Sequence, residues 1–208
     1  MPRAVGKGKQ GQTVTETSRA ERTAAELKAA ARRLLTRKSY ADIRITDITE
    51  EAGRAAGSFY RYFTDKDDLL RALVADFESA VSGQVEDMLG GPDHGLADRE
   101  DVRKHVEAYW TSYRTHHAEM SGLFQAAAVS DEFRAIHLRL REHQVDIWTA
   151  HLAQNDPAPA DPRLAALGVV CLLEYFCYEL MHYGEPAPDD RAAIAALTDL
   201  VARGVLGG

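Results

Sequence analysis

Apolar residues recur every three or four positions along almost the whole chain, which is the spacing of one face of an α-helix. No stretch alternates apolar and polar residues over the length of a strand, and no internal repeat is present. The pattern therefore predicts an all-α fold. The predicted helices span 18–39, 46–52, 55–62, a long segment after Thr64, 99–117, 118–129, 131–153, 162–183 and 190–205.

Polar signals mark the ends of several of these helices. Thr64 is followed by Asp67 at the spacing of a capping box, in which two side chains bind the free N–H groups of a helix start. Clusters rich in Gly, Pro and Asp at 90–98, 155–161 and 184–189 interrupt the helical pattern in the C-terminal part.

Charge divides the chain into two parts of opposite sign. Residues 1–66 hold 14 Lys and Arg against 8 Asp and Glu, a net charge of +6, whereas residues 67–208 hold 11 against 24, a net of −13. This asymmetry suggests an anionic partner for the basic part, with nucleic acid first, although a solvated helix face is the alternative. Within the basic part, residues 1–17 are polar and contain glycine, which predicts a disordered arm.

The composition is that of an ordinary soluble protein, with 45% apolar and 27% charged residues. The longest apolar stretch, Leu164–Leu173, is shorter than the roughly 20 residues that span a bilayer, so the sequence predicts no membrane segment. The N-terminus has no apolar core of a secretory signal. Cys171 and Cys177 lie in an apolar stretch, which fits free thiols in the cytoplasm.

Three helices fill the first 63 residues, and Gly53 breaks the chain tightly between the second and the third. This is the pattern of a helix-turn-helix DNA-binding domain, whose last helix enters the major groove. That last segment ends in SFYRYF (58–63), where hydroxyl groups alternate with aromatic rings. Such alternation suits phosphate contacts on one side of the segment and core packing on the other.

The segment ITDITEEAGRAAGSFYRYFTDKDDLL (45–70) resembles the tetracycline-repressor-like (TetR) transcriptional regulators. The resemblance implies a helix-turn-helix DNA-binding domain over 18–66 and an effector-binding and dimerisation domain over 67–208. It also implies a ligand-responsive regulator, most often a repressor, that binds a pseudo-palindromic operator as a homodimer. The positions that carry the resemblance are Ile48, Ala52, Gly53, Gly57, Ser58, Phe59, Tyr60, Tyr62, Phe63, Lys66, Leu69 and Leu70.

The same resemblance implies a set of DNA contacts. Gly57 allows close approach to the groove, and Arg61 is the residue near the base edges that can read guanine bidentately. Arg44 replaces the Thr or Ser that usually caps the second helix of the family, and Arg54 replaces a Val in the turn. For each contact, a solvated surface residue is the alternative. The expected DNA-binding residues are Thr46, Arg54, Ala56, Gly57, Ser58, Tyr60, Arg61, Tyr62 and Lys66.

The C-terminal part contains a helix, 162–183, that is apolar nearly all round and therefore predicts burial on several sides. The resemblance implies that this helix and 190–205 pair with a second copy, and that the body holds a partly apolar effector. Aromatic and polar residues are the candidates for that pocket, with plain core as the alternative for each. They are Tyr109, Trp110, Tyr113, Phe124, His137, Trp148, Tyr175 and Phe176.

No catalytic or metal-binding motif stands out. The segment 6–11 fits the GxGxxG pattern, but it follows no strand and opens no helix, so it does not indicate a dinucleotide site. We therefore expect no enzyme activity, no cofactor and no metal. Two alternatives stay open: a helical enzyme with an unrecognised site, and an architectural DNA-binding protein, against which the acidic body argues.

Overall fold

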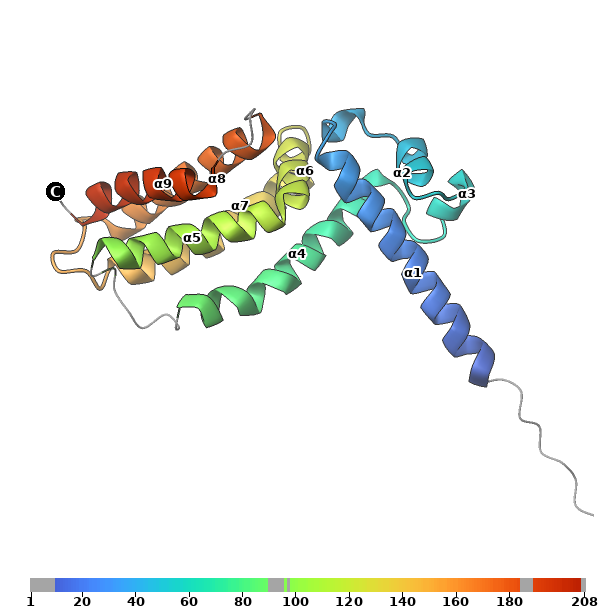
Figure 1. Cartoon of the computed structure of the whole chain (residues 1–208), viewed down its shortest axis with the longest axis horizontal. Helices are drawn as coiled ribbons and strands as arrows, with labels where there is room; N and C mark the ends of the chain where they lie inside the picture. The colour runs from blue at the N-terminus through green and yellow to red at the C-terminus, as the bar shows by residue number, and fades with distance from the viewer. Residues whose placement is uncertain (1–9, 90–95, 97, 184–188, 207–208) are drawn as a thin grey trace, which may run out of the picture. The chain divides into compact units, whose positions relative to one another are not determined.

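The computed structural model describes the backbone of residues 10–89, 96, 98–183 and 189–206, and their side chains except at 10–19 and 80–89 (Figure 1). Within these ranges all regular structure is helical, which confirms the predicted fold class. The elements are α1 (Gln10–Leu35), the 3₁₀ turn η1 (Tyr40–Asp42), α2 (Ile45–Glu51), α3 (Ala56–Phe59), α4 (Lys66–Leu89), α5 (Arg99–Thr115), α6 (His117–Ala127), α7 (Asp131–Leu152), α8 (Pro162–His182) and α9 (Asp190–Val205).

Two helices differ from the prediction in ways that bear on the first unit. The helix α1 begins at Gln10, so part of the predicted disordered arm is helical, because extending an existing helix adds one hydrogen bond per residue fixed. The helix α3 ends at Phe59, three residues early, because the carbonyl of Phe59 accepts hydrogen bonds from both Tyr62 N and Phe63 N, at 2.9 and 3.1 Å, and closes a turn. The rest of the arm, residues 1–9, lies outside the described residues.

The start of α4 is capped one residue later than the prediction from Thr64 and Asp67. Asp65 Oδ1 accepts the hydrogen bond of Asp68 N at 2.7 Å, and Asp68 Oδ2 accepts that of Thr64 N at 2.9 Å. The Asp67 carboxylate instead accepts the hydroxyl of Tyr40. Asp65 therefore caps α4, and Asp68 binds the N–H group of Thr64, the residue before the cap; a carboxylate is favoured over a hydroxyl near the positive end of a helix.

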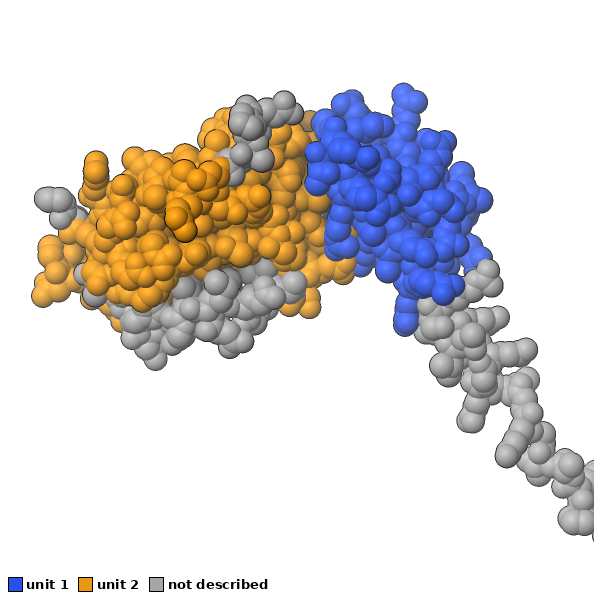
Figure 2. All heavy atoms as spheres, viewed as in Figure 1, with its two compact units in different colours: residues 1–71 blue, residues 72–208 orange. Residues whose placement is uncertain are grey.

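The chain divides into two compact units, residues 1–71 and 72–208 (Figure 2). The division falls inside α4, after Arg71 rather than after Lys66. In the first unit, α1, α2, α3 and the first turns of α4 enclose a small apolar core. Its buried side chains include Leu27, Ala31, Leu34, Ile43, Ile48, Phe59, Phe63, Leu69 and Leu70.

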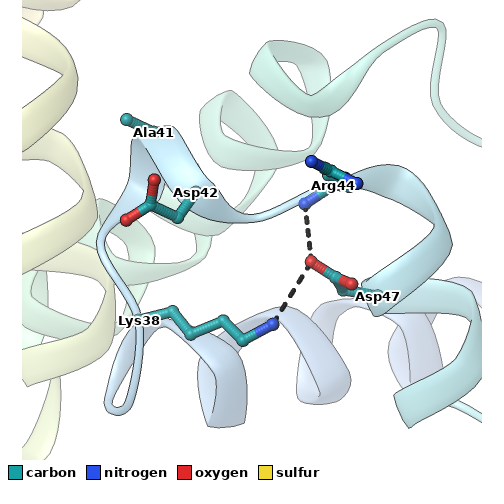
Figure 3. Close-up of a pocket in the computed structure, with 5 residues that line it drawn as sticks. All are labelled: Lys38, Ala41, Asp42, Arg44 and Asp47. Carbon is teal, nitrogen blue, oxygen red and sulfur yellow. Dashed lines mark hydrogen bonds and ion pairs between the residues drawn. The ribbon is translucent and has the colours of Figure 1, made fainter.

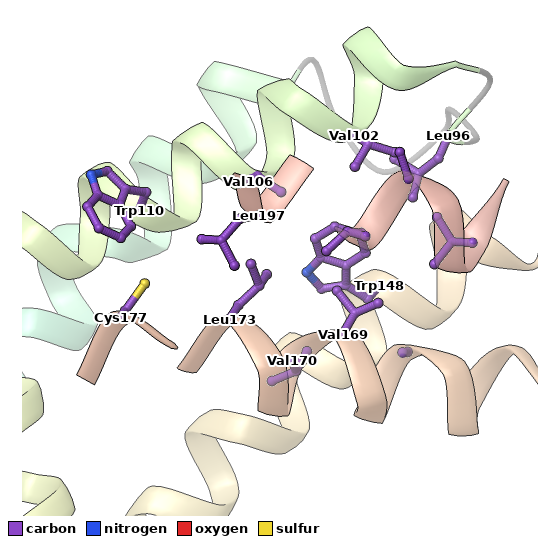
Figure 4. Close-up of a cluster of buried hydrophobic side chains, with 14 of the residues drawn as sticks. Leu96, Val102, Val106, Trp110, Trp148, Val169, Val170, Leu173, Cys177 and Leu197 are labelled. Atoms are coloured by element: carbon purple, nitrogen blue, oxygen red, sulfur yellow. The ribbon is translucent and has the colours of Figure 1, made fainter. Parts of the chain in front are cut away.

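The second unit is a bundle in which α8 packs against α7 and α9 against α5. Trp110 and Trp148 are both buried in its core, and Figure 4 shows Leu173 and Leu197 between them. Trp110 Nε1 also donates a hydrogen bond to Asp190 Oδ1 at 2.9 Å, which fixes the start of α9 against α5. Packing of large side chains in a fully buried core is the main source of stability for such a bundle.

Candidate functional site

The short helix α3 presents one exposed and one buried side. Phe59 is fully buried in the core of the first unit, whereas the next residue, Tyr60, is 63% exposed. Ala56, Gly57 and Arg61 are exposed as well. This side of α3 therefore carries the residues expected to meet DNA, together with the exposed Thr46 on α2 and the half-buried Ser58 and Tyr62.

The turn before α3 depends on Gly53, which has φ +64°. This left-handed conformation is strained for residues with a Cβ atom, and it redirects the chain after α2. Arg54 N then donates to Thr49 O at 2.8 Å, and Ser58 Oγ donates to Ala55 O at 2.6 Å. These bonds set the orientation of α3 relative to α2.

Arg54, expected to bind a phosphate, binds a carboxylate on α1. Its Nε donates to Glu26 Oε2 at 2.8 Å, and a second guanidinium nitrogen contacts the same oxygen. The turn before α3 is thereby tied to α1. No local sequence signal predicts this pair, because Glu26 and Arg54 lie 28 residues apart along the chain.

Lys66, also expected to bind a phosphate, points its ammonium group at the backbone of the η1 segment. Its Nζ donates to Tyr40 O at 2.7 Å and to Ile43 O at 3.0 Å, and lies 4.2 Å from the centroid of the Tyr40 ring. Burial lowers the pKa of Lys66 from its ordinary value, against the opposing charge of Asp67. In the structure, Lys66 therefore holds the η1 segment to the start of α4.

Lys66→Met is expected to destabilise the protein by about 2–4 kcal/mol, because two carbonyls lose a charged donor. The measurement is the urea midpoint of unfolding. Lys38→Met is the matched control, since Lys38 makes an exposed ion pair with Asp47 at 3.4 Å that contributes under about 1 kcal/mol. Equal small losses of stability in the two variants, with a loss of DNA affinity only for Lys66→Met, would instead make Lys66 a phosphate contact.

A depression of about 400 Å³ lies beside the start of α2 (Figure 3). Asp47 lines this depression, and its carboxylate accepts hydrogen bonds from Arg44 N at 3.0 Å and from the Lys38 ammonium group at 3.4 Å. The backbone hydrogen bond from Arg44 is the main cause that lowers the pKa of Asp47. Asp42 also lines the depression, so two carboxylates and two cations surround it.

The predicted pocket residues of the body occupy three different environments. Trp110 and Trp148 are core residues, as described above. Tyr175 is 55% exposed and points away from the core, because α8 buries its opposite side. Tyr109 and Phe176 are partly buried against the core, and Tyr113 is buried within it.

Phe124 and His137 are two candidates from different helices, α6 and α7, that the structure brings into direct contact. Their rings meet edge to face at a centroid distance of 5.5 Å, and Phe124 also stacks on Tyr178 at 4.3 Å. Both candidates therefore lie where α6, α7 and α8 converge. Ring pairs of this kind form a flat apolar wall, such as a small-molecule site uses.

A buried charged cluster adjoins this wall. His137 Nε2 is hydrogen-bonded to Glu174 Oε1, and Arg141 Nε donates to Glu174 Oε2 at 2.9 Å. Burial by itself raises the pKa of Glu174, but the hydrogen bond and charge of His137, with the Arg141 guanidinium, outweigh it and hold the pKa below its ordinary value. Sequence reasoning missed Glu174 and Arg141, although a carboxylate in the middle of an apolar helix is a visible signal.

The exposed side of α8 is apolar. Leu164 is 65% exposed, and Leu167, Leu172 and Tyr175 follow it at helical spacing, while Leu200 of α9 is 55% exposed. By length and composition, α8 is the one helix in the described chain that meets the criteria for crossing a membrane, with 39% of its apolar window buried. No group of three or more potential metal ligands occurs among the described side chains.

Comparisons with known proteins agree on the class of the chain. Residues 27–73 match the bacterial regulatory proteins of the tetR family. The HTH-type transcriptional regulator EthR of Mycolicibacterium smegmatis is 25% identical over 198 residues, covering 89% of this chain and 83% of that protein.

Solved structures share the fold over nearly their whole length. A tetR-family regulatory protein from Rhodococcus RHA1 has a TM-score of 0.69 and 21% identity, covering 88% of this chain and 96% of that one. FadR from Bacillus subtilis, solved in complex with stearoyl-CoA, has a TM-score of 0.65 and 16% identity, covering 87% and 98%. The helical body, and not the matched segment alone, therefore has the architecture of these regulators.

Proposed function

We propose that the chain is a DNA-binding transcriptional regulator of the tetR type, and that it acts as a homodimeric repressor released by a small-molecule effector. The exposed side of α3 and of the turn that follows it carries this proposal, since both lie inside the matched segment and the turn presents Tyr60 and Arg61 to solvent. The first unit is the DNA-binding domain in this proposal, and the second unit binds the effector. The protein works in the cytoplasm, beside the DNA.

The operator contacts follow from the geometry of a helix-turn-helix. The helix α3 enters the major groove while α2 crosses the phosphate backbone. Arg61 then reads a guanine, and the Tyr60 hydroxyl donates to a phosphate. Gly57 supports this placement, because it is exposed and has open space where a side chain would stand.

Dimerisation is proposed through the exposed apolar side of α8 and α9. A second copy would cover Leu164, Leu167, Tyr175 and Leu200 by a two-fold contact, which removes a large apolar patch from water. The same patch explains why α8 resembles a membrane-spanning helix in composition. A two-fold dimer also places two α3 helices on one DNA duplex, as a pseudo-palindromic operator requires.

The effector site is proposed around Phe124, His137 and Glu174. Its link to α4 has two described contacts within the second unit: Arg139 donates to Glu78 Oε1 at 2.6 Å, and Phe77 meets His116 at a centroid distance of 5.1 Å. Since α4 continues into the first unit, a ligand that favours a different position of α7 would shift α4 and thereby the DNA-binding units. An acyl-CoA, as seen with FadR, is the first class of compound to test.

The proposal is tested by titrating the purified protein onto DNA fragments flanking its own gene, with unrelated DNA as competitor. Tight binding to one fragment that survives competitor, and that a compound reverses, supports a ligand-responsive repressor. Equal binding to every fragment would support an architectural protein instead. A complex that forms only when the compound is added would make the protein an effector-dependent binder.

Arg61→Ala is expected to relax sequence preference at one position in each half-site by about 1–3 kcal/mol, because one bidentate guanine contact is lost. The measurement is a set of affinities for operators with single base changes. Tyr60→Phe is the comparison variant, which should weaken binding to all operators equally. A uniform loss for Arg61→Ala as well would make Arg61 a phosphate contact.

A further inference from the structure

Several cations of the first unit, among the side chains that the structure describes, pair with carboxylates inside it. Arg37 pairs with Glu51 at 2.9 Å, and Arg33 binds the other oxygen of the same carboxylate. Lys38 pairs with Asp47, and Arg54 with Glu26. Part of the positive charge of this unit therefore joins α1 to α2 and to the turn before α3, and these cations are already engaged by carboxylates.

Three exposed arginines are exceptions. Within residues 20–79, whose side chains the structure describes, no hydrogen bond or ion pair engages the guanidinium groups of Arg22, Arg44 and Arg61. Only the backbone N–H of Arg44 is bonded, to Asp47. These three guanidinium groups are thus able to meet an anion without first breaking an internal bond.

Two of the three lie on the elements that flank α3. Arg44 directly precedes α2, the helix that crosses the phosphate backbone in a helix-turn-helix. Arg22 lies one turn before Glu26 on α1, so the two share a face, and Glu26 holds Arg54 in the turn before α3. Arg22 and Arg44 therefore lie on α1 and at the start of α2, outside the segment that reads bases.

We propose that Arg22 and Arg44 bind phosphates of the operator on the two sides of α3, in the role that the sequence suggested for Arg54 and Lys66. The inference rests on the proposed function and adds the two residues that anchor it. Arg54 and Lys66 would have to give up a carboxylate or two carbonyls to bind a phosphate. A guanidinium group without an internal partner breaks no bond within the protein when it binds a phosphate. Its binding still releases counterions from the DNA.

Two carboxylates near Arg44, those of Asp42 and Asp47, differ in how strongly they oppose phosphate binding by Arg44. Asp47 faces Lys38 and the Arg44 N–H, as Figure 3 shows, so its charge is met on two sides. Asp42 is exposed and lines the same depression. Removing its charge by Asp42→Asn should therefore strengthen DNA binding through Arg44, in the opposite direction to Arg44→Gln.

The test is the salt dependence of operator binding by the full chain, measured as Kd by fluorescence anisotropy between about 50 and 200 mM salt. Each of Arg22→Gln and Arg44→Gln is expected to lower the slope of log affinity against log salt by about 0.9 per lost phosphate contact, or about 1.8 for a dimer. The loss should be the same on operator and unrelated DNA, because phosphates carry no sequence. Arg44→Lys should keep the slope, since it keeps the charge.

Arg37→Gln is the matched control. It removes the same charge from the same unit, but Arg37 already pairs with Glu51, so the slope should stay near that of the wild type. Equal slope changes for Arg37→Gln and Arg44→Gln would overturn the proposal in favour of diffuse attraction, and unchanged slopes for both Arg22→Gln and Arg44→Gln would overturn it as well. A wild-type protein that binds no DNA fragment would refute the proposed function itself, and with it this inference.

Discussion

Leu167→Glu, in the exposed apolar side of α8, is expected to convert the proposed dimer into a folded monomer. Leu167 is 40% exposed in the single chain, so a carboxylate there stays in water and leaves the fold intact. In a two-fold dimer the change occurs twice in one interface, and each buried, unpaired carboxylate costs about several kcal/mol. Operator affinity should fall by about 10²–10⁴-fold, because a monomer binds one half-site without the effective concentration of the second.

Two measurements check this expectation: the molecular mass in solution and the affinity for the operator. Leu138→Glu is the matched control, because Leu138 is also an exposed leucine, 50% exposed, but lies on α7. It should remain a dimer with wild-type affinity. A Leu167→Glu protein that stays dimeric would place the interface elsewhere, and a wild-type protein recovered only with lipid would favour a membrane role for α8.

Helix positions were predictable from the sequence because the signals for them are local. The helix α9 has the predicted bounds, and α8 begins at Pro162 because Asp161 caps it by accepting Leu164 N at 3.0 Å. The cap of α4 was misplaced by one residue because Thr64 and Asp65 are both good cap residues and lie side by side. Sequence spacing alone does not decide between adjacent candidates.

The roles of individual charges were not predictable, because they depend on contacts between distant segments. Lys66 meets Tyr40 O and Ile43 O across the first unit, and Arg54 meets Glu26. The local sequence does not distinguish a Lys or Arg that binds a group inside the protein from one whose side chain faces solvent. The sequence indicated correctly that the basic part carries the DNA-binding fold, while the assignment of its charges required side-chain positions.

The charged cluster of the body poses the same problem more sharply. The sequence predicted His137 as a pocket residue from its place among aromatic residues. Its partners Glu174 and Arg141 are identified only by their hydrogen bonds in the structure. A buried ion pair is seldom retained for stability, since apolar residues of similar volume often serve as well. The cluster therefore favours a role in recognition, and stability and response to effector become separable measurements.

Glu174→Gln alone is expected to destabilise the protein by about 3 kcal/mol, because Arg141 and His137 lose the charge that compensates them inside the body. The pKa of Glu174 is lowered in the folded state, so its charge stabilises the fold above the ordinary value of 4.5, and that contribution is lost as the pH falls through the folded pKa. The difference in unfolding free energy between wild type and Glu174→Gln should therefore shrink in acid.

A triple variant, His137→Leu with Arg141→Met and Glu174→Leu, separates the two roles of the cluster. Since no charge is left unpaired, its stability should return to within about 1–2 kcal/mol of the wild type or exceed it. DNA binding should persist, because none of the three residues lies in the first unit. Release by the effector should be lost if the cluster recognises the ligand, whereas a triple variant that is stable, binds the operator and still responds would assign the cluster to the structure of the body alone.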